Sequence, residues 1–264
     1  MPACCVTSCW PHTPGSTAAG WRMPAPPSVS MPARAACWSA CSPGRRRRTA
    51  VLDILVMVAG GYLLGSLSGS LLLGMLKGVD IRQMGSGNAG GTNALRSVGW
   101  VFALGVVLID LGKGALAAWG LPMLWLALTA SAADGLVLGV SAGLAAVIGH
   151  IWPLYFRFRG GKGAGTAVGA IAVLAPWCIL PLLLVWIVTI VGTGYVGLAT
   201  ILAGLSLVPA MWLLGPEPLP PALGALAIAM AVLLLFTHRS NVGRLLSGTE
   251  NRFEKARLLK RRRR

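Results

Sequence analysis

The sequence predicts an all-α fold, that of a polytopic integral membrane protein with about seven transmembrane helices. Of the 264 residues, 55% are hydrophobic, and only seven acidic residues stand against 23 Lys and Arg. A transmembrane helix needs about 20 predominantly apolar residues, and apolar runs cover most of the region from 51 to 237. A water-soluble protein with a single core is hard to build from such a sequence, so we expect a membrane protein.

The positive charge lies mainly at the two ends of the chain. Six Arg precede residue 49, ten Lys and Arg follow residue 237, and seven lie between them. A basic tail beside a transmembrane helix fits the positive-inside rule and the anionic cytoplasmic leaflet. We therefore expect residues 247–264 to form a basic cytoplasmic tail, and we do not expect nucleic-acid binding.

Residues 1–50 are predicted to be a disordered or non-native leader. Five of the six Cys lie in the first 41 residues, at spacings that match no zinc pattern. The segment lacks the apolar region of a signal peptide, and its basic run, Arg45–Arg48, comes at its end. We expect native translation to begin near Val51 or Met57, which the intact mass of the native protein would test. Residues 51–246 would then form the membrane domain.

Two basic loops predict which side of the membrane the connecting segments face. The first span, from about Val51 to Leu76, leads into a basic loop at 77–96. Two further crossings lead to a second basic loop at 157–162. Because Lys and Arg are enriched in cytoplasmic loops, both loops are expected at the cytoplasmic face.

The last third of the membrane domain determines the predicted number of spans. Apolar runs cover about 167–191, 195–214 and 222–237. The first run contains Pro176 and Pro181, which interrupt the hydrogen bonds of a helix, so we expect it to fold as two short helices. Four crossings then return the chain to the cytoplasmic face. The total is seven, with the N-terminus outside and the C-terminus in the cytoplasm.

The segment GSGNAGGTNALR, residues 85–96, is strongly polar although it lies beside the bilayer. Glycine lets backbone amides turn toward a small concavity that binds anions, and arginine offers a planar cation suited to phosphate or carboxylate. The candidate site residues of this segment are Gly85, Ser86, Gly87, Asn88, Thr92, Asn93 and Arg96. The spacing also fits G-x-G-x-x-G, but the strand–helix–strand context of a dinucleotide site is absent. A helix-capping loop is the alternative.

The segment GGKG places Lys162 among Gly160, Gly161 and Gly163, which leaves its ammonium group uncrowded. We predict that these four residues bind phosphate. A Walker A motif would need Ser or Thr directly after the lysine, so ATP hydrolysis is not expected. His150, near the end of the preceding apolar run, is more simply explained as a structural histidine than as a base.

The segment HRSNVGRLLSGTE, residues 238–250, follows the last apolar run. His238 and Asn241 lie at i and i+3, so they share one face if the segment is helical, and they are its candidates for site chemistry. For Arg239 and Arg244, contact with lipid phosphates is the simpler interpretation. All three polar segments fall on one predicted membrane face, which favours a single site.

An acid and a base lie inside the second predicted span. Intramembrane ionisable residues are costly, and they usually face a polar cavity or each other. Asp110 and Lys113, at i and i+3, can form an ion pair on one helix. A structural pair and a functional pair are equally good interpretations of this pattern.

Four segments together resemble the bacterial acyl-phosphate:glycerol-3-phosphate acyltransferases, the PlsY family, in order and spacing. They are GSGNAGGTNALR, LIDLGKG, GHIWPLYFRFRGGKGAGT and HRSNVGRLLSGTE, and the likeness covers roughly residues 51–254. The resemblance implies an enzyme of the cytoplasmic membrane with seven transmembrane helices and an outside N-terminus. Such an enzyme moves a fatty acyl group from acyl phosphate to the 1-hydroxyl of glycerol 3-phosphate, the first acylation of phospholipid synthesis. Its products are lysophosphatidic acid and phosphate.

The resemblance also implies roles for individual residues. Ser86, Lys162, His238 and Asn241 would be catalytic, and Arg96 would bind phosphate with the glycine-rich segments. Acyl phosphate already carries a good leaving group, so we expect direct attack by the hydroxyl without a covalent acyl-enzyme. The proton could pass to the phosphate of the donor or to His238.

The chain departs from the family pattern near the sixth predicted span. Relatives typically carry a basic residue before Tyr195 and a serine after Val196, where this chain has Gly194 and Gly197. If that serine contacts substrate, Thr200 or a water molecule must compensate. The first span also has Ser68 where proline is common in the family, which should alter its local bend.

Neither a cofactor nor a metal is predicted, because the three His are scattered and the acids are not paired. The expected partners are acyl phosphate, glycerol 3-phosphate, membrane lipid and the soluble synthase of acyl phosphate. A phosphate or organophosphate transporter is the alternative function, but transporters often contain repeats with broken helices at the midplane, and no repeat is visible. A membrane adaptor without enzymatic activity leaves the polar segments unexplained.

Overall fold

The computed structural model describes residues 43–253, with side chains described from Ala50 onward. Within this part of the chain the regular elements are helices and none is a strand, so the all-α prediction is confirmed there. Helix α2 (Pro43–Gly65) begins before Val51, where the first span was predicted to start. Residues 1–42 of the predicted leader and 254–264 of the predicted tail lie outside the described residues.

The remaining helices follow one another with short connections. They are α3 (Gly69–Lys77), α4 (Gly91–Ser97), α5 (Trp100–Ala115), α6 (Leu121–Thr129), α7 (Gly135–Ile151), α8 (Ala164–Leu174), α9 (Ile179–Thr193), α10 (Val196–Leu214), α11 (Pro221–Thr237) and α12 (Arg239–Leu246). The short turns η2 (Ile81–Gln83), η4 (Leu154–Phe156) and η5 (Pro176–Cys178) are 3₁₀-helical, and the π-helical turn η3 (Leu116–Gly120) joins α5 to α6.

Five helical segments among the described residues are long and apolar enough to cross a membrane. They are Ala50–Lys77, Trp100–Thr129, Gly135–Phe156, Pro176–Thr193 and Val196–Leu214. Helices α11 and α12, bent by 53° relative to each other, count as a sixth if they form one broken span. Helix α8 has 11 residues and is shorter than a full crossing requires. The number seven and the orientation of the termini therefore stay predictions.

The predicted division of the 167–191 run into two helices is confirmed. Helix α8 ends at Leu174, and Pro176 opens the turn η5 that leads into α9. Proline has no backbone N–H and its ring collides with the preceding turn, so a helix ends before it. Pro181 lies in the first turn of α9, where the missing N–H breaks no hydrogen bond.

The first predicted span is not continuous, because the chain leaves helical geometry between Gly65 and Gly69. Backbone groups freed by such a break need partners in a membrane, and α5 supplies two of them. Lys113 Nζ donates to the carbonyl of Leu67 at 3.0 Å, and Asp110 Oδ1 accepts the N–H of Gly69 at 3.1 Å. The predicted ion pair forms as well, with 2.9 Å between Lys113 Nζ and Asp110 Oδ1.

His150 completes this buried group. Its Nδ1 lies 2.8 Å from Lys113 Nζ and 3.3 Å from Asp110 Oδ1. All three side chains are buried. The interpretation of Asp110 and Lys113 as a structural pair and that of His150 as a structural histidine both fit these contacts.

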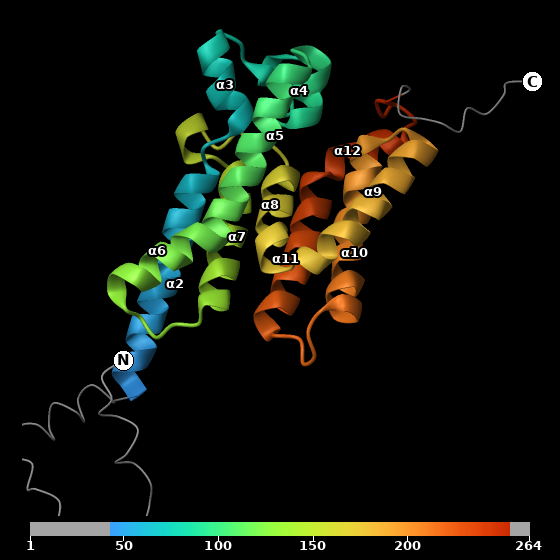
Figure 1. Cartoon of the computed structure of the whole chain (residues 1–264). Helices are drawn as coiled ribbons and strands as arrows, with labels where there is room; N and C mark the ends of the chain where they lie inside the picture. Colours follow the sequence, from blue (N-terminus) through green and yellow to red (C-terminus); the bar gives the residue numbers. More distant parts are fainter. Residues whose placement is uncertain (1–42, 254–264) are drawn as a thin grey trace, which may run out of the picture. The chain divides into compact units, whose positions relative to one another are not determined.

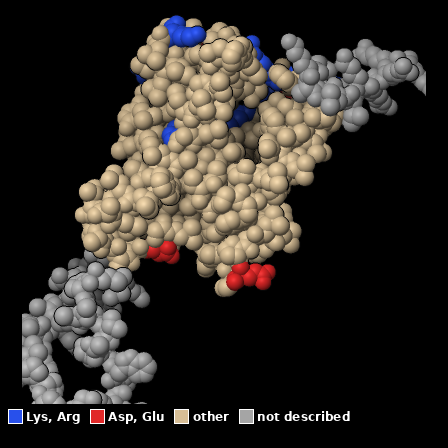
Figure 2. All heavy atoms as spheres, in the orientation of Figure 1, with Lys and Arg blue, Asp and Glu red and all other residues tan. Residues whose placement is uncertain are grey.

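The Lys and Arg side chains that are visible on the surface lie mainly at one end of the helix bundle. Figure 1 shows α3 and α4 at one end, and the α6–α7 and α10–α11 connections at the other. Figure 2 shows blue Lys and Arg gathered toward the α3–α4 end and red acidic side chains at the opposite end. The basic end carries the predicted cytoplasmic loops, and it is there that the polar segments meet.

Candidate active site

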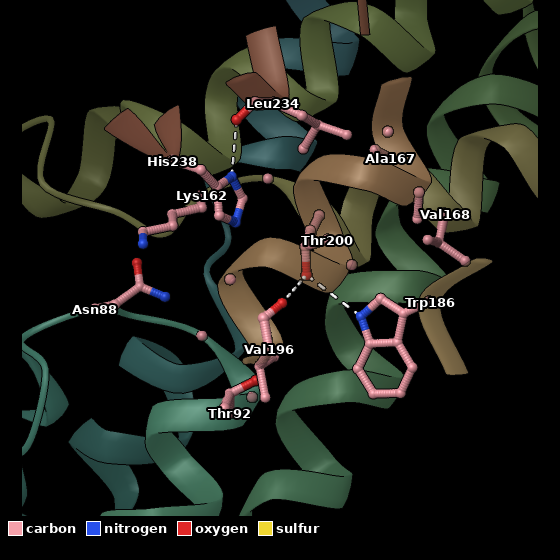
Figure 3. A pocket seen from close by; sticks show the side chains of 18 of the residues that line it. Asn88, Thr92, Lys162, Ala167, Val168, Trp186, Val196, Thr200, Leu234 and His238 are labelled. Carbon is pink, nitrogen blue, oxygen red and sulfur yellow. Dashed lines mark hydrogen bonds between the residues drawn. The ribbon is translucent and has the colours of Figure 1, made fainter. Parts of the chain in front are cut away.

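A cavity of about 600 Å³ brings the three polar segments together (Figure 3). The predicted residues that line it are Ser86, Asn88, Thr92, Asn93, Arg96, Lys162, Gly163, His238 and Asn241. Gly85 and Gly87 do not line it, and their positive φ angles of 55° and 71° shape the loop between η2 and α4 instead. Residues of all three polar segments therefore line one cavity, and their roles in a single site stay a prediction.

The same cavity has an apolar wall built by helices α5, α8, α9 and α10. Its apolar lining includes Val107, Leu111, Val168, Ile171, Leu182, Leu183, Trp186, Ala203 and Leu207. Cations and amides at one end and hydrocarbon at the other make the cavity amphipathic. This shape suits a molecule that carries a phosphate group on a long apolar chain.

Asn93 holds the first polar loop in place. Its Nδ2 donates to the carbonyls of Ile81, Met84 and Asn88 at 3.1, 2.9 and 3.1 Å. Its Oδ1 accepts the backbone N–H of Ser86 at 3.0 Å. Both the Nδ2 and the Oδ1 of Asn93 thus bind backbone groups of the loop. The geometry favours a structural role for Asn93, which fixes the loop, beside its predicted role in substrate binding.

The backbone amides that the sequence predicts as an anion-binding concavity donate within the protein. The N–H of Ser86 is bound by Asn93, and those of Gly160 and Gly161 donate to carbonyls at the end of α7 at 3.2 and 3.1 Å. The prediction that the amides of Gly160 and Gly161 face the site is wrong, because the loop uses them to close its own turn. Positive charge in the cavity comes from side chains instead.

Lys162 is carried by a loop that packs tightly on α7. A Cβ atom at Gly161 would overlap the imidazole of His150 and the carbonyl of Ala89. Glycine is therefore required next to the lysine by close packing. The carbonyl of Lys162 accepts a hydrogen bond from Thr237 Oγ1 at 3.1 Å, which ties the loop to α11 as well.

A chain of polar contacts leads from the lysine to a glutamate. Lys162 Nζ donates to Asn241 Oδ1, and Asn241 Nδ2 donates to Glu250 Oε1 at 2.7 Å. Arg244 Nε donates to Glu250 Oε2, also at 2.7 Å. Burial lowers the pKa of Lys162 to about 8, with a further decrease from Arg244 and a partial increase from Glu250. The lysine is thus held charged near neutral pH but close to its titration.

His238 connects α11 to α12 and is buried in the wall of the cavity. Its Nδ1 lies 2.8 Å from the carbonyl oxygen of Leu234, so Nδ1–H donates there and Nε2 carries the lone pair of the neutral ring. The ring and Asn241 line the same cavity, as their i and i+3 spacing predicts. Figure 3 shows this bond, and it shows the amine of Lys162 pointing toward the side-chain amide of Asn88.

Sequence reasoning missed the roles of Arg244 and Glu250. Arg244 was interpreted as a lipid anchor, but it lines the cavity and pairs with Glu250, so that interpretation is wrong. The pairing across the turn after α12 could have been suspected, because Glu250 is an acid in a segment otherwise rich in Arg. Among the described residues, no group of three or more His, Cys, Asp or Glu could hold a metal ion.

Thr200 lies in the cavity wall one turn from the family's serine position, which Gly197 occupies here. Its Oγ1 donates to the carbonyl of Val196 at 2.9 Å and accepts from Trp186 Nε1 at 3.3 Å (Figure 3). A Cβ atom at Gly197 would overlap the side chain of Asn241. The absence of a side chain at residue 197 therefore leaves room for Asn241.

The protein has helices long enough to cross a membrane and an amphipathic cavity with cations at its polar end. These features define the class of integral membrane proteins that act on phosphate-bearing lipids. A family model described as glycerol-3-phosphate acyltransferase matches residues 55–248. The chain belongs to this family of acyltransferases, and the resemblance seen in the four sequence motifs is confirmed.

Relatives and solved structures agree with the family model. A glycerol-3-phosphate acyltransferase of Shouchella clausii is 43% identical over 210 residues, covering 78% of this chain and 98% of the relative. One of Chlorobaculum parvum is 38% identical over 226 residues, covering 76% and 97%. The crystal structure of PlsY (YgiH), an integral membrane glycerol 3-phosphate acyltransferase, matches with a TM-score of 0.67 and 36% identity, covering 76% of this chain and 95% of that one. This match is to its glycerol 3-phosphate form. Its lysophosphatidic acid form matches with a TM-score of 0.66 and 34% identity, covering 77% and 97%.

Proposed function

We propose that the protein transfers a fatty acyl group from acyl phosphate to the 1-hydroxyl of glycerol 3-phosphate, yielding lysophosphatidic acid and phosphate. The observation that carries the proposal is the single cavity in which Lys162, Arg96 and Arg244 meet an apolar wall. The forms in which PlsY was solved support glycerol 3-phosphate as acceptor and lysophosphatidic acid as product. The reaction would be the first acylation of phospholipid synthesis.

The orientation follows from the same proposal. Seven transmembrane helices, with α8 as one of them, would place the N-terminus outside and the basic loops in the cytoplasm of a bacterium. The cavity's polar end would then face the cytoplasm, where glycerol 3-phosphate is dissolved, and its apolar wall would face the lipid. A soluble synthase of acyl phosphate would deliver the donor from the cytoplasmic side.

Both substrates are phosphate anions, so cations are the main binding groups. A hydrogen bond to a charged group contributes about 1.5–3 kcal/mol, and several are needed to hold two anions together. Arg96, Lys162 and Arg244 supply the positive charge, and Ser86 and Thr92 offer hydroxyl groups beside them. Holding the acceptor hydroxyl against the acyl carbonyl then exploits proximity, which can lower a barrier by about 7–11 kcal/mol.

The chemical step is a direct attack. The 1-hydroxyl oxygen forms a bond to the acyl carbon, the bond between that carbon and the phosphate oxygen breaks, and the hydroxyl proton goes to the departing phosphate. His238 Nε2 accepts a hydrogen bond from the hydroxyl while the acceptor binds, and the hydroxyl then turns its proton toward the phosphate as the attack begins. We assign the proton to phosphate because an additional positive charge on a buried imidazole among cations is costly.

The test uses purified protein with glycerol 3-phosphate and one donor at a time: acyl phosphate, acyl-CoA or acyl carrier protein. We expect lysophosphatidic acid, detected by mass spectrometry, from acyl phosphate alone. Product from another donor would contradict the assigned donor. If folded protein makes no product from any donor, the proposal fails, and counterflow of labelled glycerol 3-phosphate in proteoliposomes would then test transport.

The pH dependence of kcat/KM tests the role of Lys162. Because the pKa of Lys162 is lowered to about 8, the ammonium that binds phosphate is present below this pH and is lost above it. We expect kcat/KM to fall above about pH 8, approaching tenfold per pH unit. In Lys162→Arg the side chain stays charged, so the decline should move to higher pH. An unchanged alkaline limb in that variant would contradict the assignment.

A further inference from the structure

A second cavity, of about 310 Å³, lies beside the first. It is lined by Asn88, Ile151, Trp152, Phe158, Arg159, Gly160, Gly161, Lys162, Phe236, Thr237 and Arg239. Asn88 and Lys162 line both cavities. The two cavities therefore adjoin at these two residues.

The charge of the second cavity is positive. Its described lining contains three cations, Arg159, Lys162 and Arg239, and no acid. Arg239 is held in place, since its guanidinium stacks on the Phe236 ring at 4.5 Å and its Nη1 donates to the Phe236 carbonyl at 3.1 Å. The guanidinium of Arg239 uses one face for the ring and one N–H for the carbonyl, so its other N–H groups remain available to bind an anion.

The loop that presents Arg159 is fixed by contacts from outside the cavity. Arg82 Nη1 donates to the carbonyls of Phe156 and Arg159 at 3.3 and 3.4 Å. Arg82 itself is paired with Asp80 at 2.8 Å. These contacts hold the backbone of the loop and leave the guanidinium of Arg159 for the cavity.

The same loop has an uncommon backbone. Arg157 and Phe158 have φ angles of 56° and 57°, in the left-handed region that non-glycine residues rarely adopt. Such a conformation is strained for an L-residue, and residues of this kind cluster at functional sites. Here the turn brings both Phe158 and Arg159 into the lining of the cavity.

We propose that the second cavity is a binding site for a phosphate group. This inference rests on the proposed function, in which the donor releases phosphate next to Lys162. The lipid product keeps its acyl chain against the apolar wall, whereas phosphate has no apolar part. Phosphate can leave past Lys162 and Asn88 into the second cavity, where Arg159 and Arg239 bind it. A lipid headgroup carries the same phosphate chemistry and is the other possible source.

Equilibrium dialysis of the full chain with labelled inorganic phosphate, in detergent without lipid, tests the site. We expect the natural protein to bind one more phosphate per chain than Arg159→Gln/Arg239→Gln, in which affinity at the second cavity falls at least tenfold. Arg157→Gln, a change in the same loop but outside both linings, should bind as many as the natural protein. Phosphate that the double variant still binds in the first cavity shows that this variant is folded. Equal numbers of bound phosphates in the natural protein and the double variant overturn the proposal.

Nanodiscs of phosphatidylglycerol separate the two sources of phosphate. Retention of the second inorganic phosphate assigns the site to free phosphate. Its displacement by lipid assigns the site to a headgroup and overturns the release route. The donor assay on the same preparation separates the proposed acyl transfer from the proposed phosphate site. If the protein makes lysophosphatidic acid but binds no phosphate in the second cavity, only the second proposal is contradicted.

Discussion

Lys162→Met is expected to lower kcat/KM by about 10²–10³-fold, the effect of removing one group that stabilises charge in a transition state. Lys162 lines both cavities and donates to Asn241, and in the proposed reaction it binds the phosphate that leaves. Methionine preserves much of the apolar stem and removes the charge. Steady-state rates with acyl phosphate as donor give the measurement.

Lys77→Met serves as the matched control for this loss of a positive charge. Lys77 is exposed at the end of α3, lines neither cavity and lies 5.9 Å from the Phe102 ring. We expect its kcat/KM to stay within about threefold of the natural protein, since surface substitutions usually change energies by about 0.5 kcal/mol or less. A Lys162→Met enzyme that keeps more than a tenth of the natural kcat/KM would contradict the assigned role.

Breaking the buried ion pair is expected to have the largest effect on stability. Asp110→Asn or Lys113→Met alone leaves one charge buried without its partner, which typically costs about 3–5 kcal/mol. Each change also removes a contact to the break in the first span, at Gly69 or Leu67. Denaturant unfolding in detergent, followed by tryptophan fluorescence, gives the free energy of unfolding.

The double variant Asp110→Asn/Lys113→Met distinguishes charge burial from general damage. Because it removes both charges, it should be more stable than at least one of the single variants, with a coupling energy on the order of 1–3 kcal/mol. Asp134→Asn is the control, since asparagine caps a helix about as well as the aspartate that now binds Leu136 N–H. Single variants that unfold like the natural protein would contradict the structural role.

The all-helical fold and the presence of the polar segments at one end of the bundle could be predicted, because each depends on local pattern. Lys162, His238 and Asn241 stand beside long apolar runs, and such runs fix which end of a helix meets water. Arg244 was placed wrongly, because its partner Glu250 is reached by a turn after α12 rather than by helical spacing, and the lone acid in a segment rich in Arg was the only signal of the pair. The wrong assignment of the Gly160 and Gly161 amides has a similar cause, since their acceptors lie on another helix.

The break near Ser66–Ser68 illustrates a second limit of sequence reasoning. The apolar run was predicted to form one span with a local bend altered at Ser68, and a complete break was not predicted, because three serines change its mean hydropathy little. The signal lay elsewhere in the chain, in Asp110 and Lys113, two ionisable residues that needed partners inside the membrane. Besides each other, they bind backbone groups of the first span. Every residue has such groups, so the sequence does not indicate which of them serve as partners.

That break also has a consequence for biogenesis. The first span is synthesised before α5, yet the carbonyl of Leu67 and the N–H of Gly69 find their partners on α5. Until α5 enters the bilayer, these groups have neither water nor protein to bind them in the hydrocarbon region. The first span therefore reaches its final hydrogen-bonded shape only after α5 lies beside it.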